Sequence, residues 1–256
     1  MLSLLTTIAF AGSCELSRSG TEPCRVACDK GDAEACSALG FLLETGHGLE
    51  QPPPTANEMV FHSEFDDEYG GQIVQDIPKV NDVPGAVIAY GKGCALGDPY
   101  GCVSTGVLQN LEGPRQDKAA AKENFSKAFH GWTAGCARGD GRDCQHIAAS
   151  WWGNWGHAED ARESYKWSAR ACELNDGRGC WAQANALIAG EVVPRDLDLA
   201  EKLHIKSCDA IGEIVGCLAL EDFYGPKGER KNPHKAKRYR ARSCSLDEVF
   251  CQRPDL

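Results

Sequence analysis

The sequence predicts an all-α solenoid of helical hairpins whose corners are linked by disulfides. Two observations predict this fold class: a repeat of 36 residues, and a pair of cysteines in every copy of it. The first cysteine of each pair stands at positions 28, 94, 136, 172, 208 and 244, so the last three intervals are 36 residues and the first two are 66 and 42. A fixed period of this length is typical of repeats that each contain two helices. The two longer intervals are interpreted as the same unit with insertions.

Each copy is predicted to contain two helices joined by a short loop. A helical stretch that ends at glycine follows each second cysteine, at residues 37–46, 103–113, 145–153, 181–190 and 218–225. A second helix then runs into the next first cysteine. Eight residues before that cysteine stands a small residue in every copy: Ala86, Ala128, Ser164, Ala200 and Ala236. Small residues at one fixed position predict a close helix crossing, because little side chain keeps the helix axes apart.

The residues between paired cysteines predict a corner between hairpins. A residue that tolerates the left-handed conformation stands three places after the first cysteine in four copies: Gly31, Gly97, Gly139 and Asn175. An acidic residue follows in the corner: Asp32, Asp98, Asp140, Asp176, Glu213 and Asp247. Aspartate is a strong N-cap and its charge suits the positive end of the helix dipole. One cysteine therefore ends a helix and the other begins the next, so the two sulfurs can meet.

Six local disulfides are predicted from this spacing. The pairs are Cys28–Cys36, Cys94–Cys102, Cys136–Cys144, Cys172–Cys180, Cys208–Cys217 and Cys244–Cys251. Structural zinc sites use cysteines two to four residues apart, whereas no CxxC occurs here and the seven histidines do not follow the period. We therefore expect no metal site. Closing a loop of this size restricts the unfolded chain by about 2.6 kcal/mol in the loop-entropy model.

Composition and the first residues favour export. The chain of 256 residues contains 14 cysteines, and disulfides among them would require an oxidising compartment. Its net charge of −10 disfavours nonspecific binding to nucleic acid. Residues 1–13 resemble a signal segment, with a small-x-small pattern at Ala9–Ala11, and residues 14–256 form the repeat region. Two fates of Cys14 remain open: a lipid anchor that leaves Cys24 unpaired, or a Cys14–Cys24 disulfide. We expect a periplasmic or secreted protein, and membrane attachment only through such a lipid.

The residues Ala27 to Gly40 carry a resemblance to a known family. Their pattern, A-C-x-x-G-D-x-x-x-C-x-x-L-G, resembles the Sel1-like repeat in the cysteine-rich form found in secreted Helicobacter-type cysteine-rich proteins. The likeness covers residues 24–251 and implies a right-handed superhelix of αα-hairpins, similar to tetratricopeptide repeats. This sequence departs from the family pattern in three places: the insertion 50–82, the long stretch 114–130 and the irregular last two corners.

The resemblance also implies a possible enzyme, because cysteine-rich members of the family are often described as β-lactamase-like and as binding penicillin-like molecules. The residues do not supply a known mechanism: S-x-x-K, SDN, KTG, HxHxDH, HExxH and GxxxxGK[ST] are all absent from the sequence. We therefore predict no catalytic residues and no cofactor. A β-lactam-binding or hydrolysing envelope enzyme remains an alternative.

Three non-repeating features are candidates for recognition. The insertion 50–82 holds eight acidic residues and one lysine, and the segment 227–242 holds eight Lys or Arg and one Glu; each is either a solvated surface or a contact surface. Trp151 is expected in the core, whereas Trp152 and Trp155 are candidate binding residues. The sequence thus predicts an adaptor that binds a protein or peptide on the concave face of the solenoid. A module that binds peptidoglycan or another glycan is a further alternative.

Overall fold

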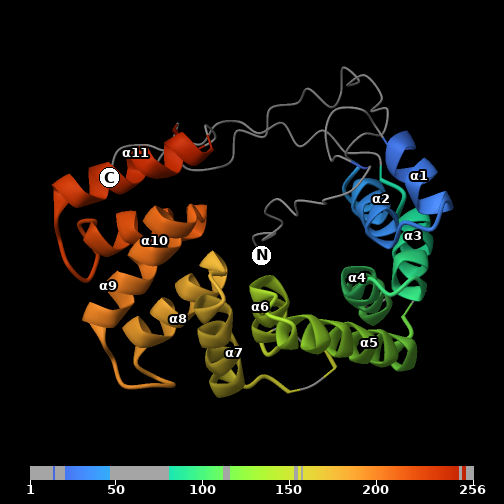
Figure 1. Ribbon diagram of the computed structural model, residues 1–256, viewed down its shortest axis with the longest axis horizontal. Helices are drawn as coiled ribbons and strands as arrows, with labels where there is room; N and C mark the ends of the chain where they lie inside the picture. Colours follow the sequence, from blue (N-terminus) through green and yellow to red (C-terminus); the bar gives the residue numbers. More distant parts are fainter. Residues whose placement is uncertain are drawn as a thin grey trace, which may run out of the picture. The chain divides into compact units, whose positions relative to one another are not determined.

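A computed structural model describes residue 14 and residues 21–46, 81–111, 116–152, 155–156, 158–247 and 250–251 (Figure 1). Every regular element in these ranges is a helix. In chain order they are α1 (Glu22–Asp29), α2 (Ala33–Thr45), α3 (Val83–Ala95), α4 (Pro99–Asn110), α5 (Lys118–Ala137), α6 (Gly141–Ser150), α7 (Ala161–Glu173), α8 (Gly177–Ala189), α9 (Leu197–Ile205), the π-helix η1 (Lys206–Ile211), α10 (Ile214–Tyr224) and α11 (Pro233–Leu246). The predicted all-α class is therefore confirmed. The predicted signal segment 1–13 lies outside the described residues, as does the insertion 50–82 apart from its last two positions.

The chain divides into two compact units, Met1–Gly131 and Trp132–Leu256, with the boundary inside α5. Within each unit, successive helices pack as antiparallel neighbours in hairpins. The first helices of successive hairpins also touch directly: α2 contacts α4 in the first unit, and α8 contacts both α6 and α10 in the second. This stacking is the arrangement expected for helical-hairpin repeats. None of the described helices combines the length and apolar character that a membrane span requires.

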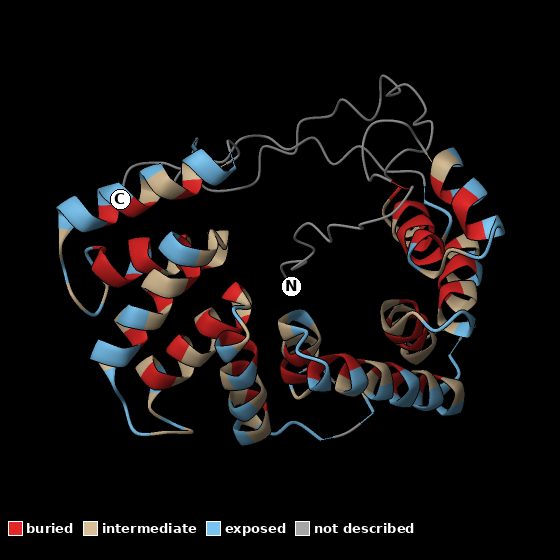
Figure 2. Cartoon of the chain, viewed as in Figure 1, coloured by how far each residue is buried: buried red, intermediate tan, exposed pale blue. Residues whose placement is uncertain are grey.

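Buried residues lie along the helix faces that meet within each unit (Figure 2). In the first unit Tyr90 is 1% exposed, and its ring packs where Gly40 brings α2 close to α3. A Cβ atom on Gly40 would lie 2.5 Å from the Tyr90 ring, so only glycine permits this crossing. The five small residues predicted at close crossings, Ala86, Ala128, Ser164, Ala200 and Ala236, are all buried.

All six predicted corner disulfides are present, and Cys14 and Cys24 form a seventh, so every cysteine of the chain is paired. The paired Cα atoms lie 4.4 to 4.8 Å apart, within the range that disulfides require. Because the Cys14 sulfur is bonded to Cys24, this state excludes a lipid thioether on the same atom.

The predicted left-handed residues and capping aspartates are observed in the first four corners. Their left-handed residues have positive φ: Gly31 (93°), Gly97 (97°), Gly139 (97°) and Asn175 (62°). The aspartate after each of them accepts a hydrogen bond from a backbone N–H in the first turn of the next helix: Asp32 from Ala35, Asp98 from Tyr100 and Gly101, Asp140 from Arg142 and Asp143, and Asp176 from Gly179. Local sequence therefore sets both the direction change and the start of the next helix.

The two residues that immediately precede the paired cysteines face each other across the corner. A Cβ atom on Gly179 would lie 2.5 Å from the Cβ of Ala171, and one on Gly216 would lie 2.5 Å from the Cβ of Ser207. At least one of the two residues is glycine or alanine in the first five corners. These small residues allow the two helices to approach closely enough for the sulfurs to bond.

The fifth corner departs from the prediction. Its cysteines are nine residues apart instead of eight, and the helix before the corner widens into the π-helix η1, which absorbs the extra residue. Gly212 supplies the left-handed φ of 81°. Glu213 occupies the N-cap position of α10 but makes no side-chain cap hydrogen bond, so its predicted capping role is wrong. Its longer carboxylate instead reaches Arg178 at 3.6 Å.

Two further predictions concern residues at helix ends. Asp247 is the C-cap residue of α11, and its predicted role as the cap of a following helix stays a prediction, because residues 248–249 lie outside the described residues. Trp151, expected in the core, is only partly buried, because α6 ends at Ser150 and Trp151 is its C-cap residue. Its counterparts in other repeats, Leu43 and Leu187, lie within helices and are buried.

Candidate functional site

The tryptophans predicted to bind a partner lie at the end of α6 in the second unit. Trp152 is 61% exposed, whereas Trp155 is partly buried against Trp132 of α5, with ring centroids 6.0 Å apart. Trp132 is buried and also stacks on His146 of α6 at 5.1 Å. Trp155 is thus partly a packing residue, while Trp152 presents its indole to solvent.

The histidine in this aromatic stack is neutral at physiological pH. Burial, and then the positive charges of Arg142 and Arg178, lower the pKa of His146 to about 4. A neutral imidazole stacks on the Trp132 indole as one aromatic ring on another. The stack therefore fixes the position of α6 relative to the end of α5 without adding a charge near Trp152.

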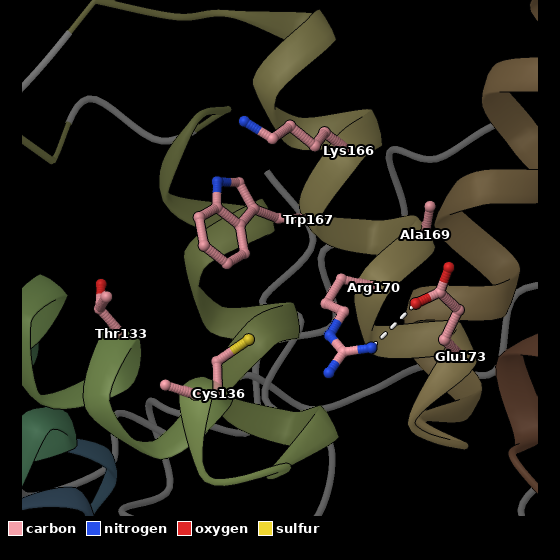
Figure 3. A pocket seen from close by; sticks show the side chains of 8 residues that line it. Thr133, Cys136, Lys166, Trp167, Ala169, Arg170 and Glu173 are labelled. Carbon is pink, nitrogen blue, oxygen red and sulfur yellow. Dashed lines mark hydrogen bonds and ion pairs between the residues drawn. The ribbon is translucent and has the colours of Figure 1, made fainter.

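A second feature of the same unit is a pocket of about 430 Å³ between the end of α5 and α7 (Figure 3). Its lining residues are Thr133, Cys136, Ala137, Lys166, Trp167, Ala169, Arg170 and Glu173. Figure 3 shows the indole of Trp167 between the side chains of Lys166 and Arg170, with Thr133 and Cys136 facing it from α5. The pocket thus offers one aromatic wall with a cation on either side.

Among the described residues, the cations beside Trp167 form exposed ion pairs. The Lys166 ammonium lies 6.0 Å from the Trp167 ring centroid and 3.4 Å from Glu163. Arg170 lies 3.0 Å from Glu173. Side chains of both pairs are largely exposed, and exposed pairs of this kind contribute about 0–1 kcal/mol. Either cation can therefore turn to a bound group at little cost.

The basic segment 227–242 is partly used inside the second unit. Four of its eight cations pair with acids of α9, η1 and α10: Arg230 with Asp198 and Glu201, Lys235 with Glu201, Arg238 with Asp209, and Arg240 with Glu221. Glu221 is fully buried, so its pair with Arg240, at 2.9 Å, holds α11 against α10. The other four cations, Lys227, Lys231, Lys237 and Arg242, form no ion pair with a described residue. Contact with an anionic partner stays a prediction for these four.

Solved structures show which fold these hairpins form. The chain is similar to a Sel1 repeat protein from Oxalobacter formigenes, with a TM-score of 0.56, 20% identity, and coverage of 87% of this chain and 75% of that one. It is also similar to c5321, a protective antigen of uropathogenic Escherichia coli with an SLR fold, with a TM-score of 0.50, 19% identity, and coverage of 90% of this chain and 42% of that one. A third similar structure, Helicobacter pylori cysteine rich protein B, has a TM-score of 0.40, 27% identity, and coverage of 51% of this chain and 94% of that one.

The chain therefore has the Sel1-like repeat fold, as the resemblance predicted. At about 20% identity these similarities define the fold and not a partner or an activity. No protein-family model matches the sequence, and no curated protein matches it.

The sequence prediction omitted Trp167, although the repeat contains a signal for it. Four residues before the first cysteine of three corners stands a buried ring: Tyr90, Trp132 and His204, which are 1%, 3% and 1% exposed. In the fourth copy that position is Ser168, which is buried, and the aromatic residue is Trp167, one place earlier. Aligning this position across the copies would have shown that the fourth copy carries its ring one place earlier, but it would not have given the exposure of Trp167, because Tyr239 at the same place in the last copy is buried.

Proposed function

We propose that this chain is an exported, disulfide-linked Sel1-like repeat protein that binds a protein or peptide partner as an adaptor. The single observation that carries the proposal is the exposed indole of Trp152, which is 61% exposed at the end of α6. Exposed tryptophans are costly in water and are enriched among the residues that dominate protein–protein binding energy. The rigid helical repeats around it would present this side chain in a fixed position.

The disulfides support the cellular location in this proposal. Each of the 14 cysteines is paired, and such a complete set of disulfides is stable in an oxidising environment. The export route is proposed to be a cleaved signal segment, with Cys14 bonded to Cys24. Intact-mass and peptide analysis of the protein from its native envelope tests this: a peptide in which Cys14 and Cys24 are joined supports cleavage, whereas a diacylglyceryl group on Cys14 contradicts it.

The binding proposal is tested by crosslinking the oxidised protein to an envelope extract and identifying the captured proteins by mass spectrometry. The test variant is Trp152→Ala, and the matched control is Leu111→Ala in the first unit, because Leu111 is 58% exposed and also follows the end of a helix. We expect Trp152→Ala to reduce capture of a specific partner about tenfold or more, and Leu111→Ala to leave capture unchanged.

Equal capture by both variants would contradict the proposed role of Trp152. Circular dichroism and non-reducing peptide mapping check that both variants keep their helices and disulfides. The alternative enzymatic role has its own test, since turnover of a chromogenic β-lactam in proportion to the protein, abolished by one point substitution, would replace the adaptor proposal.

A further inference from the structure

Trp167 lies outside the core because two neighbouring residues of α7 have exchanged their usual roles. In three other copies a buried ring stands four residues before the cysteine, as for Tyr90 and His204, and in the last copy the buried ring is Tyr239, one place earlier. In α7 the buried position holds Ser168, which is 2% exposed, and the large ring of Trp167 lies on the adjacent face. Core packing therefore does not account for the tryptophan, which makes it available to a ligand.

The pocket around Trp167 suits an apolar side chain. The faces of Trp167, Ala137 and Ala169 offer carbon atoms, and the side chain of Thr133 adds a methyl group. A volume of about 430 Å³ is enough for a large side chain together with part of its backbone. A buried or half-buried indole wall is the kind of surface on which such side chains contribute most to binding.

Two cations and one acid of α7 line the pocket around Trp167. Lys166 precedes Trp167 by one residue and Arg170 follows it by three, while Glu173 lies beside Arg170. The lining therefore carries a net positive charge, which suits a single carboxylate placed over the ring. A broad anionic surface such as a membrane would meet Glu163, one turn before Trp167, as well as Glu173, so the arrangement favours a single carboxylate.

We propose that this pocket binds a segment of a partner polypeptide that contains an apolar side chain next to an aspartate or glutamate. The apolar side chain packs on Trp167, and the adjacent carboxylate lies between Lys166 and Arg170. This inference rests on the proposed role in protein binding, and it names the chemistry of the partner at a surface other than Trp152. The two exposed ion pairs of α7 open when the carboxylate enters, which costs little because each is weak.

A displayed library of random peptides, blocked at both ends, tests the sequence preference. The library is selected against the oxidised wild-type protein and, in parallel, against Trp167→Ala and the control Leu111→Ala, which also removes an exposed apolar side chain. We expect wild-type and Leu111→Ala proteins to enrich peptides with an apolar residue next to an acid, and Trp167→Ala to lose this enrichment. A selection against Trp152→Ala separates this inference from the proposed function. Enrichment that is lost in Trp152→Ala but kept in Trp167→Ala would overturn the pocket and leave the proposed adaptor intact. Enrichment that Trp167→Ala keeps unchanged would overturn the pocket in every case.

A matched pair of peptides then tests the carboxylate. The best selected peptide and its copy with glutamine or asparagine in place of the acid are titrated against the protein, and binding is measured by calorimetry. We expect the amide copy to bind about threefold to tenfold more weakly to wild-type protein, and both to bind equally to Lys166→Gln/Arg170→Gln. The variant Trp167→Phe should keep most of the affinity. Equal binding of acid and amide by wild-type protein would overturn the proposed role of the cations.

Two other occupants of the pocket are outcomes of the same series. If soluble peptidoglycan fragments displace the selected peptide from wild-type protein and bind Trp167→Ala weakly, the pocket is a glycan site and the proposal is wrong. If sedimentation shows a dimer that Trp167→Ala dissociates, a second copy of this chain fills the pocket. Monomeric protein without glycan binding, together with the peptide preference, supports the proposal.

Discussion

The fourth and fifth corners of the repeat solve one geometric problem in different ways. In the fourth corner, Asn175 takes the left-handed conformation and Asp176 caps α8 by accepting a hydrogen bond of 2.7 Å from the Gly179 N–H. In the fifth corner one extra residue is present, the preceding helix becomes η1, and Glu213 caps nothing. The paired Cα atoms are nevertheless 4.4 Å apart in the fourth corner and 4.7 Å apart in the fifth.

The difference teaches that these two corners share the disulfide and the left-handed residue, whereas the cap can be replaced. The fifth corner is held to the preceding one by contacts between repeats. Lys206 donates a hydrogen bond of 2.6 Å to the carbonyl oxygen of Cys172, and the Ser207 hydroxyl donates one of 2.7 Å to the carbonyl oxygen of Gly177. Bonds to the neighbouring repeat thus replace the local bonds that the extra residue disrupts.

The largest expected effect comes from removing either disulfide. Replacing Cys172 and Cys180 by alanine, or Cys208 and Cys217 by alanine, should each lower the free energy of unfolding by about 2–4 kcal/mol, because the closed loops are nearly equal in length. Urea unfolding of the oxidised proteins measures both. If the disulfide of the fifth corner contributed much less to the free energy of unfolding than that of the fourth, the two corners would not be equivalent. Peptide mapping confirms that the other disulfides remain intact.

Acid should destabilise the fifth repeat more than the fourth. The position four residues before the cysteine is His204 in α9 and Ser168 in α7, and burial lowers the pKa of His204 from its usual 6.5 to about 4. The unfolded chain therefore binds a proton that the folded chain does not, and stability is lost as pH falls from about 6.5 to about 4. The shift corresponds to about 3 kcal/mol.

The variant His204→Leu tests this acid sensitivity. Its unfolding free energy should fall less between pH 7 and pH 4 than that of the wild type. Part of the dependence should remain, because the pKa of His146 is lowered in the same direction. An unchanged pH profile in His204→Leu would show that this histidine does not cause the effect.

Removing the acidic side chain at the N-cap position should lower the free energy of unfolding by a smaller amount, and by more in the fourth corner than in the fifth. Asp176→Ala loses the bond to the Gly179 N–H, so we expect it to cost about 1 kcal/mol. Glu213→Ala loses only a pair with Arg178 at 3.6 Å, which should cost less than about 0.5 kcal/mol. Thermal unfolding of the two variants at pH 7 gives the comparison, and Asp176→Asn, which keeps a capping oxygen, is the control. Equal losses would show that Asp176 does not act as a cap.

The smallest effect is expected from deleting Ile211. The deletion leaves seven residues between Cys208 and Cys217, with Gly212 three places after the first cysteine and Glu213 next, as in the regular corners. We expect the disulfide to form, the π-helical turn to become α-helical, and stability to change by less than about 1 kcal/mol, the scale of a helix cap. Non-reducing peptide mapping and urea unfolding check this. Loss of the disulfide would show that the extra residue is required for the corner.

The sequence by itself determined the helical hairpins, the corners and the pairing of the twelve corner cysteines, whereas it left the pairing of Cys14 with Cys24 open. These features are local: a cysteine, a left-handed glycine or asparagine, a capping aspartate and a second cysteine act within nine or ten residues of each other. Physical interactions over such short separations can be inferred from residue order alone. Trp152 is exposed as expected, but the sequence position does not determine this exposure, because Trp151 is only partly buried and Ile188, the counterpart of Trp152, is partly buried too.

Only the tertiary structure decided which non-repeating side chains remain available to a partner. It engaged half of the cations of the segment 227–242 in ion pairs with α9, η1 and α10, and it packed Trp155 on Trp132. It also placed Trp167 beside the end of α5, where it forms one wall of a pocket. Each outcome depends on residues about 20 to 35 positions apart meeting across helix faces, and the spacing within one repeat carries no information about such contacts.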